Sequence, residues 1–236
     1  MNNHVISVII PTYQHAEVLG SCIDSILNQS FRSFEIIVVN DGSTDHTLKV
    51  LDKYHGKIKV INQDNQGSNF ARNRGLTEAT GEYVIFCDAD VILEKKALFE
   101  MYNALRANPS ASIAYSKFKF GWKTFHPFKF NAEKLIEKNY IHTTSLVRKK
   151  DFPGFDTSVK RLQDWDVWLT MLENKKSGVL IDEVLFKVRI HGTSRIGSSW
   201  LPSLVYKIPW NKIRWVPNRI IKYNEAHDVI RKKHNL

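Results

Sequence analysis

Short apolar runs alternate with amphipathic stretches along the first 110 residues. Each of four apolar runs predicts a buried strand, and the stretch that follows it has the apolar spacing of a helix. The predicted strands cover residues 5–10, 34–39, 57–61 and 82–87, and the predicted helices cover residues 15–28, 44–53, 68–79 and 95–107. Because strand and helix alternate four times, we expect an α/β fold with a mainly parallel central sheet and helices on both faces.

The alternation weakens after residue 110. The pattern there predicts strands at 113–120 and 140–147, an aromatic and basic loop at 121–131, a helix at 164–172, and one or two strands within 179–189. No linker or shift in composition divides the chain before residue 196. We therefore expect one domain over residues 1–196, with halves at 1–110 and 111–196, and a tail over residues 197–236.

The composition narrows the class of protein. With 236 residues, 43% of them hydrophobic and 25% charged, the chain can bury a full hydrophobic core without disulfides or a structural metal. Two cysteines, Cys22 and Cys87, exclude a disulfide framework and a multi-cysteine zinc site, and they favour a reducing compartment. The sequence shows neither an apolar run long enough for a membrane span nor the pattern of a signal peptide. We expect a cytoplasmic protein.

Charge is distributed unevenly along the chain. Residues 1–100 hold 9 Lys and Arg against 13 Asp and Glu, whereas residues 101–236 hold 25 against 11. A basic half suggests nucleic acid as a partner, but zinc-ligand spacing, an RNA-binding strand motif and a helix-turn-helix are all missing. An anionic lipid surface or a phosphate-bearing substrate would use the same charge, and a solvated basic surface is the alternative. We expect no nucleic-acid partner.

Three of the predicted strands end in polar residues. These ends are Pro11-Thr12-Tyr13, Asn40-Asp41-Gly42 and Asp88-Ala89-Asp90. Ligands of parallel α/β sheets bind beyond the carboxyl ends of the strands. Two carboxylates one residue apart repel each other unless a cation intervenes, and a hard divalent cation prefers oxygen ligands. Asp88 and Asp90 therefore suggest a metal site, with turn capping as the alternative. No glycine-rich loop follows the first strand, which argues against a nicotinamide or flavin enzyme.

Two further features point to a phosphate-bearing ligand. Asp41 follows a fully apolar strand, where it is either a turn former or an acceptor for a base or ribose. Arg72 and Arg74 lie near the predicted start of a helix, where phosphate groups bind favourably. Solvated surface arginines are the alternative.

Taken together, these residues resemble the inverting glycosyltransferases of family 2, which have the GT-A fold of nucleotide-diphospho-sugar transferases. The resemblance covers about residues 4–195. The matching stretches are Val8 to Tyr13, Glu35 to Asp45, Asn65-Gln66-Gly67 with Ala71-Arg72-Asn73, Asp88-Ala89-Asp90, Gly154-Phe155-Asp156, Gln163 to Leu169, and Arg189-Ile190-His191.

The resemblance implies that residues 1–110 bind the nucleotide-sugar donor, in particular a UDP-sugar. In such enzymes the end of the first strand holds the base, and Asp41 accepts a hydrogen bond from a uracil-type base. Arg72 lies near the diphosphate or base, and Asp88 reaches the ribose or a metal-bound water. The donor-binding residues implied for this chain are Pro11, Thr12, Tyr13, Asp41, Arg72, Asp88 and Ala89.

The resemblance also implies a divalent cation and a catalytic base. Asp90 binds Mn²⁺ or Mg²⁺ directly, and Asp88 and His191 complete the metal site. Asp164 matches the base that deprotonates the acceptor hydroxyl, so that the anomeric configuration inverts. The divalent ion stabilises the leaving diphosphate, which removes the need for the second proton-transferring carboxylate of a glycoside hydrolase.

The acceptor side carries one departure from the family pattern. The family usually has Glu-Asp where this chain has Gln163-Asp164. Gln163 retains hydrogen-bonding capacity but loses a charge, which leaves its acceptor contact open. Trp165, beside the base, is either a platform for an acceptor sugar or a core tryptophan. An inactive scaffold protein is the alternative function that Gln163 supports. A sugar-1-phosphate nucleotidyltransferase lacks support because the basic glycine-rich loop it requires is absent.

The sequence does not identify the donor sugar or the acceptor, which we expect to be a growing cell-surface glycan or a lipid-linked oligosaccharide. The tail from residue 200 contributes eight Lys and Arg against two acidic residues, together with Trp200, Trp210 and Trp215. Aromatic residues with basic neighbours suit a membrane interface. We expect the tail, with a helix from Asn218, to dock the enzyme peripherally on an anionic membrane; packing against residues 1–196 is the alternative.

Overall fold

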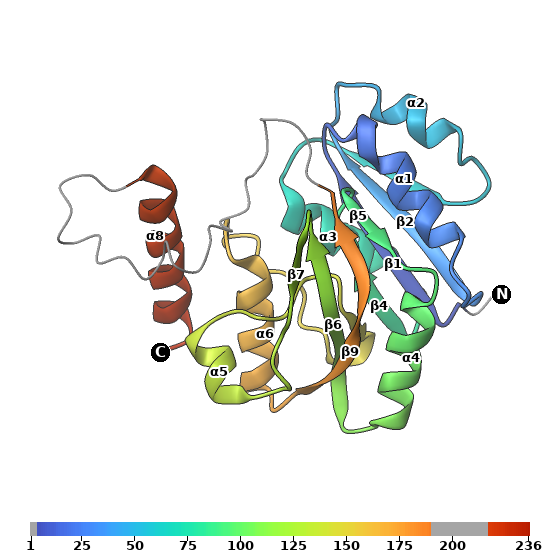
Figure 1. Cartoon of the computed structure of the whole chain (residues 1–236). Coiled ribbons are helices and arrows are strands. Elements are labelled where there is room, and N and C mark those ends of the chain that lie inside the picture. The colour runs from blue at the N-terminus through green and yellow to red at the C-terminus, as the bar shows by residue number, and fades with distance from the viewer. Residues whose placement is uncertain (1–3, 190–216) are drawn as a thin grey trace.

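The structure is a computed structural model that describes residues 4–189 and 217–236. The described chain forms one mixed sheet with helices on both faces, and a C-terminal helix lies against one side (Figure 1). The strands are β1 (Ile6–Thr12), β2 (Phe34–Asp41), β3 (Lys59–Gln63), β4 (Tyr83–Phe86), β5 (Val91–Leu93), β6 (Ala111–Phe120), β7 (Lys123–Phe125), β8 (Leu146–Arg148) and β9 (Ser177–Val188). The α-helices are α1 (Ala16–Leu27), α2 (Thr47–Asp52), α3 (Ser68–Glu78), α4 (Ala97–Ala107), α5 (Ala132–Glu137), α6 (Gln163–Glu173) and α8 (Asn218–Lys233).

The sheet has a parallel part and a mixed part. Its strand order is β3-β2-β1-β4-β8-β6-β9-β5. Strand β7 is outside this order and pairs with the C-terminal end of β6. Strands β1 to β4 are parallel, as the alternation predicts, and β6 pairs with β9 in parallel. The short strand β8 is antiparallel to both β4 and β6. It therefore leaves β4 and β6 pointing the same way, so that their carboxyl ends reach the same edge of the sheet.

The core fills both faces of the sheet because β1 and β2 are apolar throughout. Alternate residues of a strand point to opposite faces, so Val8 and Ile10 join the cluster under α1 and α4, whereas Ile9 joins the cluster under α3 and α6. Helix α3 lies close to the sheet at Gly75, where an added Cβ would come within 2.4 Å of Ile9 Cγ2. This close approach brings the start of α3 to the carboxyl end of β1.

Some elements differ from those that the sequence pattern predicts. Residues 121–131 contain strand β7, which forms a hairpin with β6, and helix α5 begins at Ala132. Strand β5 is also unpredicted, since three residues are too few to show a periodicity. Only the end of the predicted strand at 140–147 pairs, as β8. The preceding residues turn instead, because His142 Nδ1 accepts a hydrogen bond from Thr144 N–H and Asn139 Oδ1 accepts one from Ile141 N–H.

The tail is described only from residue 217. The predicted helix from Asn218 is present as α8, which packs against α6; Ile230 is fully buried in the same cluster as Trp165. Packing against the preceding domain was the alternative to membrane docking, and α8 adopts it. Residues 200–216, with their three tryptophans, lie outside the described residues. Within the described part of the chain, no helix is both long enough and apolar enough to cross a bilayer.

Candidate active site

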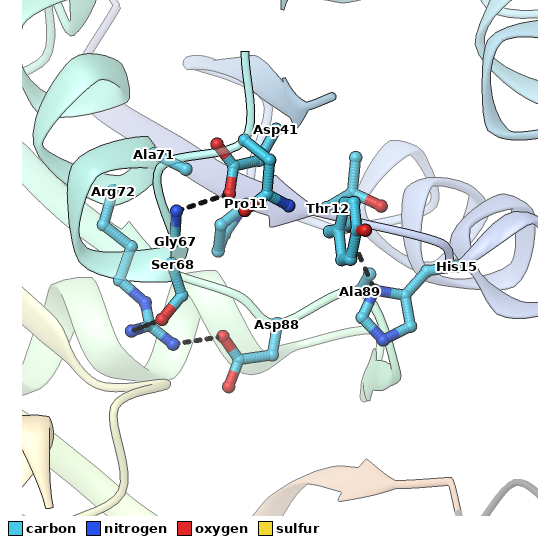
Figure 2. A pocket seen from close by; sticks show the side chains of 12 residues that line it. Pro11, Thr12, His15, Asp41, Gly67, Ser68, Ala71, Arg72, Asp88 and Ala89 are labelled. Atoms are coloured by element: carbon cyan, nitrogen blue, oxygen red, sulfur yellow. Dashed lines mark hydrogen bonds and ion pairs between the residues drawn. The ribbon is translucent and has the colours of Figure 1, made fainter. Parts of the chain in front are cut away.

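A cavity of about 440 Å³ opens at the carboxyl ends of β1, β2 and β4 (Figure 2). It collects all three polar strand ends that the sequence singled out. The residues that line it are Pro11, Thr12, Tyr13, His15, Asp41, Asn65, Gly67, Ser68, Ala71, Arg72, Asp88 and Ala89. Every residue that we expect to contact the donor is therefore part of one cavity.

Asp41 connects the end of β2 to the loop before α3. Its Oδ1 accepts hydrogen bonds from Gln63 Nε2 (2.8 Å) and the backbone N–H of Gln66 (2.9 Å), and its Oδ2 accepts one from Gly67 N–H (2.8 Å). Gly67 adopts φ of +98°, a conformation that residues with a Cβ rarely take, and α3 starts at the next residue. Asp41 thus shapes the cavity wall. Its Oδ1 accepts two of these three hydrogen bonds and its Oδ2 accepts one.

Arg72 and Asp88 form an ion pair inside the cavity. Arg72 Nη2 donates to Asp88 Oδ1 over 2.8 Å, and Nη1 donates to Ser68 Oγ (3.4 Å) and Asn69 Oδ1 (3.3 Å), as Figure 2 shows for Ser68. Burial alone would raise the pKa of Asp88, but the Arg72 guanidinium outweighs it and the pKa is lowered. Asp88 is therefore an anion whose position is set by the first turns of α3.

Asp90 lies in a different electrostatic environment. Burial and the negative charge of Asp88 raise the pKa of Asp90 to about 7. Arg72 pairs with Asp88 and not with Asp90, and among residues 4–189 and 217–236 no other cation forms an ion pair with Asp90. Two crowded carboxylates, one of them poorly ionised, form a site that a cation stabilises. The residues present therefore fit a hard divalent ion with oxygen ligands.

Two carboxylates alone do not complete a metal site. No three His, Cys, Asp or Glu side chains converge on a possible metal position within residues 4–189 and 217–236. The third predicted ligand, His191, lies outside the described residues. Arg189, two positions earlier, donates its backbone N–H to the carbonyl oxygen of Asp90 (2.9 Å). The chain therefore passes next to Asp90 shortly before it reaches His191, and the complete ligand set stays a prediction.

Asp164 lies in the first turn of α6. Its Oδ2 accepts a hydrogen bond from Asn139 Nδ2 (2.7 Å), and its Oδ1 accepts one from Trp165 N–H (3.0 Å). Burial raises the pKa of Asp164 above that of an ordinary aspartate, against the opposing effects of Trp165 N–H, the Arg72 charge and Asn139. A raised pKa makes this carboxylate a stronger base, and the influence of Arg72 places it within electrostatic reach of the cavity.

The two neighbours of Asp164 differ in their access to the cavity. Gln163 Nε2 lies 3.5 Å from Oγ of the cavity residue Ser68 and donates to Lys160 O (3.2 Å). Trp165 is 1% exposed, its Nε1 donates to Leu135 O, and its ring stacks on His227 of α8 at 4.9 Å. The structure thus favours the alternative that Trp165 is a core tryptophan, because no face of its ring is open to a sugar.

The sequence analysis missed several residues around the cavity. His15 and Ser68 line it, Asn139 holds Asp164, and the His142 ring packs against Phe118 and Phe186 near Asp88. Burial lowers the pKa of His142 to about 4, despite the nearby Asp88 charge. None of these residues belongs to a recognisable motif. Asn139 and His142 could have been found only by knowing that the turn at residues 138–145 lies beside Asp88 and Asp164.

The fold defines an α/β protein of the GT-A type. The sequence profile described as "Glycosyl transferase family 2" matches residues 7–160, more than half of the chain. The chain belongs to this family.

Relatives in the family cover parts of this chain to different extents. A cholesterol galactosyltransferase of Borreliella burgdorferi is 39% identical over 121 residues, which is 50% of this chain and 34% of the relative. An uncharacterized glycosyltransferase of Rickettsia typhi is 29% identical over 226 residues, which is 88% of this chain and 70% of the relative. The chain therefore spans about a third of the first protein and most of the second.

Solved structures share the fold at low sequence identity. The S. aureus TarS fragment 1–349 in complex with UDP-GlcNAc has a TM-score of 0.69 and 20% identity, over 94% of this chain and 72% of that one. The mannosyltransferase PcManGT of Pyrobaculum calidifontis, in complex with GDP-Man and Mn²⁺, has a TM-score of 0.64 and 16% identity, over 97% of this chain and 70% of that one. Both likenesses establish the fold alone.

Proposed function

We propose that this chain transfers a sugar from a nucleoside-diphosphate donor, a UDP-sugar, to the hydroxyl group of a glycan or lipid-linked acceptor, with inversion at the anomeric carbon. The observation that carries the proposal is the position of Asp164, whose raised pKa suits a base, next to Gln163, whose Nε2 lies 3.5 Å from Oγ of the cavity residue Ser68. The donor complexes of the TarS and PcManGT structures support a nucleotide-sugar ligand for this fold.

The donor half of the cavity supplies binding and charge compensation. In this proposal Thr12, Tyr13 and Asp41, which line the cavity, surround the nucleotide base, and Arg72 near the start of α3 binds the diphosphate. A divalent cation bound by Asp88, Asp90 and His191 would stabilise the negative charge that develops on the leaving diphosphate. The Mn²⁺ in the PcManGT structure supports a divalent cation, and we propose Mn²⁺ or Mg²⁺.

Proton transfer falls to Asp164. In the proposed step its carboxylate accepts the proton of the acceptor hydroxyl while the acceptor oxygen attacks the anomeric carbon from the face opposite the diphosphate. Asn139 and the Trp165 N–H fix the orientation of this carboxylate. Gln163, whose Nε2 lies 3.5 Å from Ser68 Oγ, is our candidate for a hydrogen bond to the acceptor. Because the chain retains Asp164, the residue that matches the family's base, we propose no second function based on the Gln163 departure.

The β6–β7 hairpin is our candidate for acceptor contact in place of Trp165. Its tip carries Trp122, which is 94% exposed. The sheet register pairs Phe120 with Val188, and Val188 with Val91, the residue that follows Asp90. The hairpin tip therefore follows directly after the position on β6 that is in register with the residue after Asp90. An exposed aromatic ring flanked by Lys123 suits a sugar chain that carries negative charge.

We also propose that the C-terminal tail docks the enzyme on an anionic membrane. With α8 packed against α6, the docking segment would be residues 200–217, whose aromatic and basic residues suit an anionic interface. This placement would keep a lipid-linked acceptor near the enzyme.

The test of the proposed function is a screen of nucleotide sugars with Mn²⁺, read out as donor hydrolysis and as transfer to candidate acceptors, with wild type and Asp164→Asn. We expect the variant to bind UDP normally and to lose roughly 10²–10⁴-fold in turnover, the contribution typical of a general base. Asparagine retains the acceptor oxygen that contacts Trp165 N–H and loses only the acceptor for Asn139 Nδ2, so a purely structural role for Asp164 predicts turnover within about tenfold of the wild type. That result would reject Asp164 as the base.

A further inference from the structure

Helix α8 is fastened to the helix that carries Asp164. Lys233 Nζ lies 2.7 Å from Asp166 Oδ1, and His234 Nε2 lies 2.9 Å from the same oxygen. Asp166 is 2% exposed and lies in the first turn of α6, two residues after Asp164. A carboxylate this deeply buried is costly unless it is paired and hydrogen-bonded. Its two basic partners in the described structure both come from the end of α8.

The contact extends along α6. His234 Nδ1 lies 2.7 Å from Glu173 Oε1, in the last turn of α6, so the imidazole ring spans the helix from Asp166 to Glu173. His227 stacks on Trp165, the residue next to Asp164. The two residues that follow the proposed base are thus both held by α8.

Lys233 also contacts a segment that is hydrogen-bonded to α3. Its Nζ donates to Asp156 Oδ2 over 2.7 Å. The backbone around Asp156 is tied to α3, because Asn69 Nδ2 donates to Asp156 O (2.7 Å) and Asn73 Nδ2 donates to Phe155 O (2.7 Å). Asn69 and Asn73 flank Arg72 on this helix.

One ammonium group therefore connects two parts of the site. On one side it reaches the segment bonded to the helix of Arg72, and on the other it pairs with Asp166 on the helix of Asp164. We propose that Lys233 is a positioning residue, which sets the proposed base on α6 relative to the donor held by α3. The expected effect of Lys233 on turnover rests on the proposed function, whereas the restraint of α6 relative to α3 does not.

The restraint has a kinetic signature that simple packing lacks. The donor cavity is built by β1, β2, β4 and α3, so releasing α6 leaves donor binding largely intact. The base, however, must be placed within a fraction of an ångström of the acceptor hydroxyl, and misplacement by about 1 Å costs on the order of 10²-fold in rate. Loss of Lys233 should therefore lower kcat and leave the donor Kd nearly unchanged.

The experiment compares the full-length variants Lys233→Met, Lys233→Arg and Asp156→Asn with the wild type. Lys232→Met is the matched control, since Lys232 is exposed and adjacent on α8. Three quantities are measured below the melting temperature of each variant: kcat for transfer, UDP affinity by calorimetry, and hydrogen exchange of residues 155–170. We expect Lys233→Met to lose roughly 10- to 100-fold in kcat, with UDP affinity within about twofold and faster exchange in that segment.

The remaining variants separate positioning from folding. Lys233→Arg can form both ion pairs and should restore much of kcat, and Asp156→Asn should lose part of kcat while the Lys233–Asp166 pair stays. A Lys233→Met protein that is less heat-stable but has wild-type kcat and exchange would overturn the proposal, as would equal effects in Lys232→Met. If the wild type transfers no sugar at all, the proposed function fails, and hydrogen exchange still decides whether Lys233 restrains the two segments.

Discussion

Arg72 Nη2 donates a 2.8 Å hydrogen bond to Asp88 Oδ1, and this ion pair places one cation and one anion in the same donor cavity. The pair keeps Asp88 ionised while it holds the guanidinium near the start of α3. Arg72 therefore compensates for a carboxylate, and in the proposed function it also attracts the diphosphate.

We predict that Arg72→Gln weakens UDP binding at least about tenfold, because it removes a charged donor from a site for a dianionic ligand. The measurement is calorimetric titration with UDP in the presence of Mn²⁺. Arg74→Gln is the control, since Arg74 is on the same helix but exposed and paired with Glu78. Equal losses in both variants would point to long-range charge and not to a contact at Arg72.

Binding of Mn²⁺ should release a proton from Asp90. The pKa of Asp90 is raised to about 7 by burial and by Asp88, so the carboxyl group is largely protonated at pH 6 and must ionise to bind the metal. Metal affinity should fall as the pH falls below about 7. Calorimetry at pH 6 in two buffers of different ionisation enthalpy measures the proton release directly. Asp90→Asn should bind little metal, and metal binding without proton release in the wild type would contradict this assignment.

Asn139 should control the acidic limb of the pH–rate profile. Asp164 acts as a base only when it is ionised, so kcat falls as the pH falls through its raised pKa. The hydrogen bond from Asn139 stabilises the carboxylate and lowers that pKa, so Asn139→Ala should move the acidic limb to higher pH. Asn174→Ala, at the far end of α6, is the control. An unchanged limb would show that another group titrates.

Trp122→Ala should impair acceptor binding more than donor binding. We expect the acceptor KM to rise about tenfold, equivalent to about 1.4 kcal/mol, with UDP affinity unchanged. Phe99→Ala on α4 is the control, because Phe99 is an exposed aromatic residue on another element. A similar KM for wild type and Trp122→Ala would exclude the hairpin from acceptor binding.

Membrane docking can be tested without removing α8, whose contacts with α6 make a truncation ambiguous. The double variant Trp210→Ala, Trp215→Ala leaves residues 218–236 unchanged. We expect the wild type to co-sediment with anionic vesicles, less so at high salt, and the variant to bind more weakly. The same assay with zwitterionic vesicles is the control. Binding of both proteins to the same extent, or of neither, argues against docking through this segment.

The donor half of the site was predictable for a physical reason. Parallel strands bring their carboxyl ends to one edge, so polar residues after β1, β2 and β4 converge whatever the details of their loops. Pro11, Asp41 and Asp88 line one cavity as expected. The local apolar periodicity that identifies those strands is long enough to recognise, and the alternation with helices determines their direction.

The acceptor half was harder to predict because its form depends on contacts distant in sequence. Residues 140–145 have the composition of a strand, but side-chain hydrogen bonds from Asn139 and His142 turn the backbone. Trp165 had two equally reasonable roles, and only the position of His227 favours one of them. No motif connects Asp166 to Lys233, since neither residue type nor spacing along the chain indicates that the two meet.

The Asp166–Lys233 contact joins residues 67 positions apart, and this separation bears on the order in which the molecule folds. During synthesis, β1 to β9 can form before α8 emerges from the ribosome, but the Asp166 carboxylate then has neither of its basic partners. Contacts of large sequence separation form late because loop closure must come first. We therefore expect the donor cavity to become competent before the proposed base is fixed, so that a nascent chain binds nucleotide before it is able to transfer sugar.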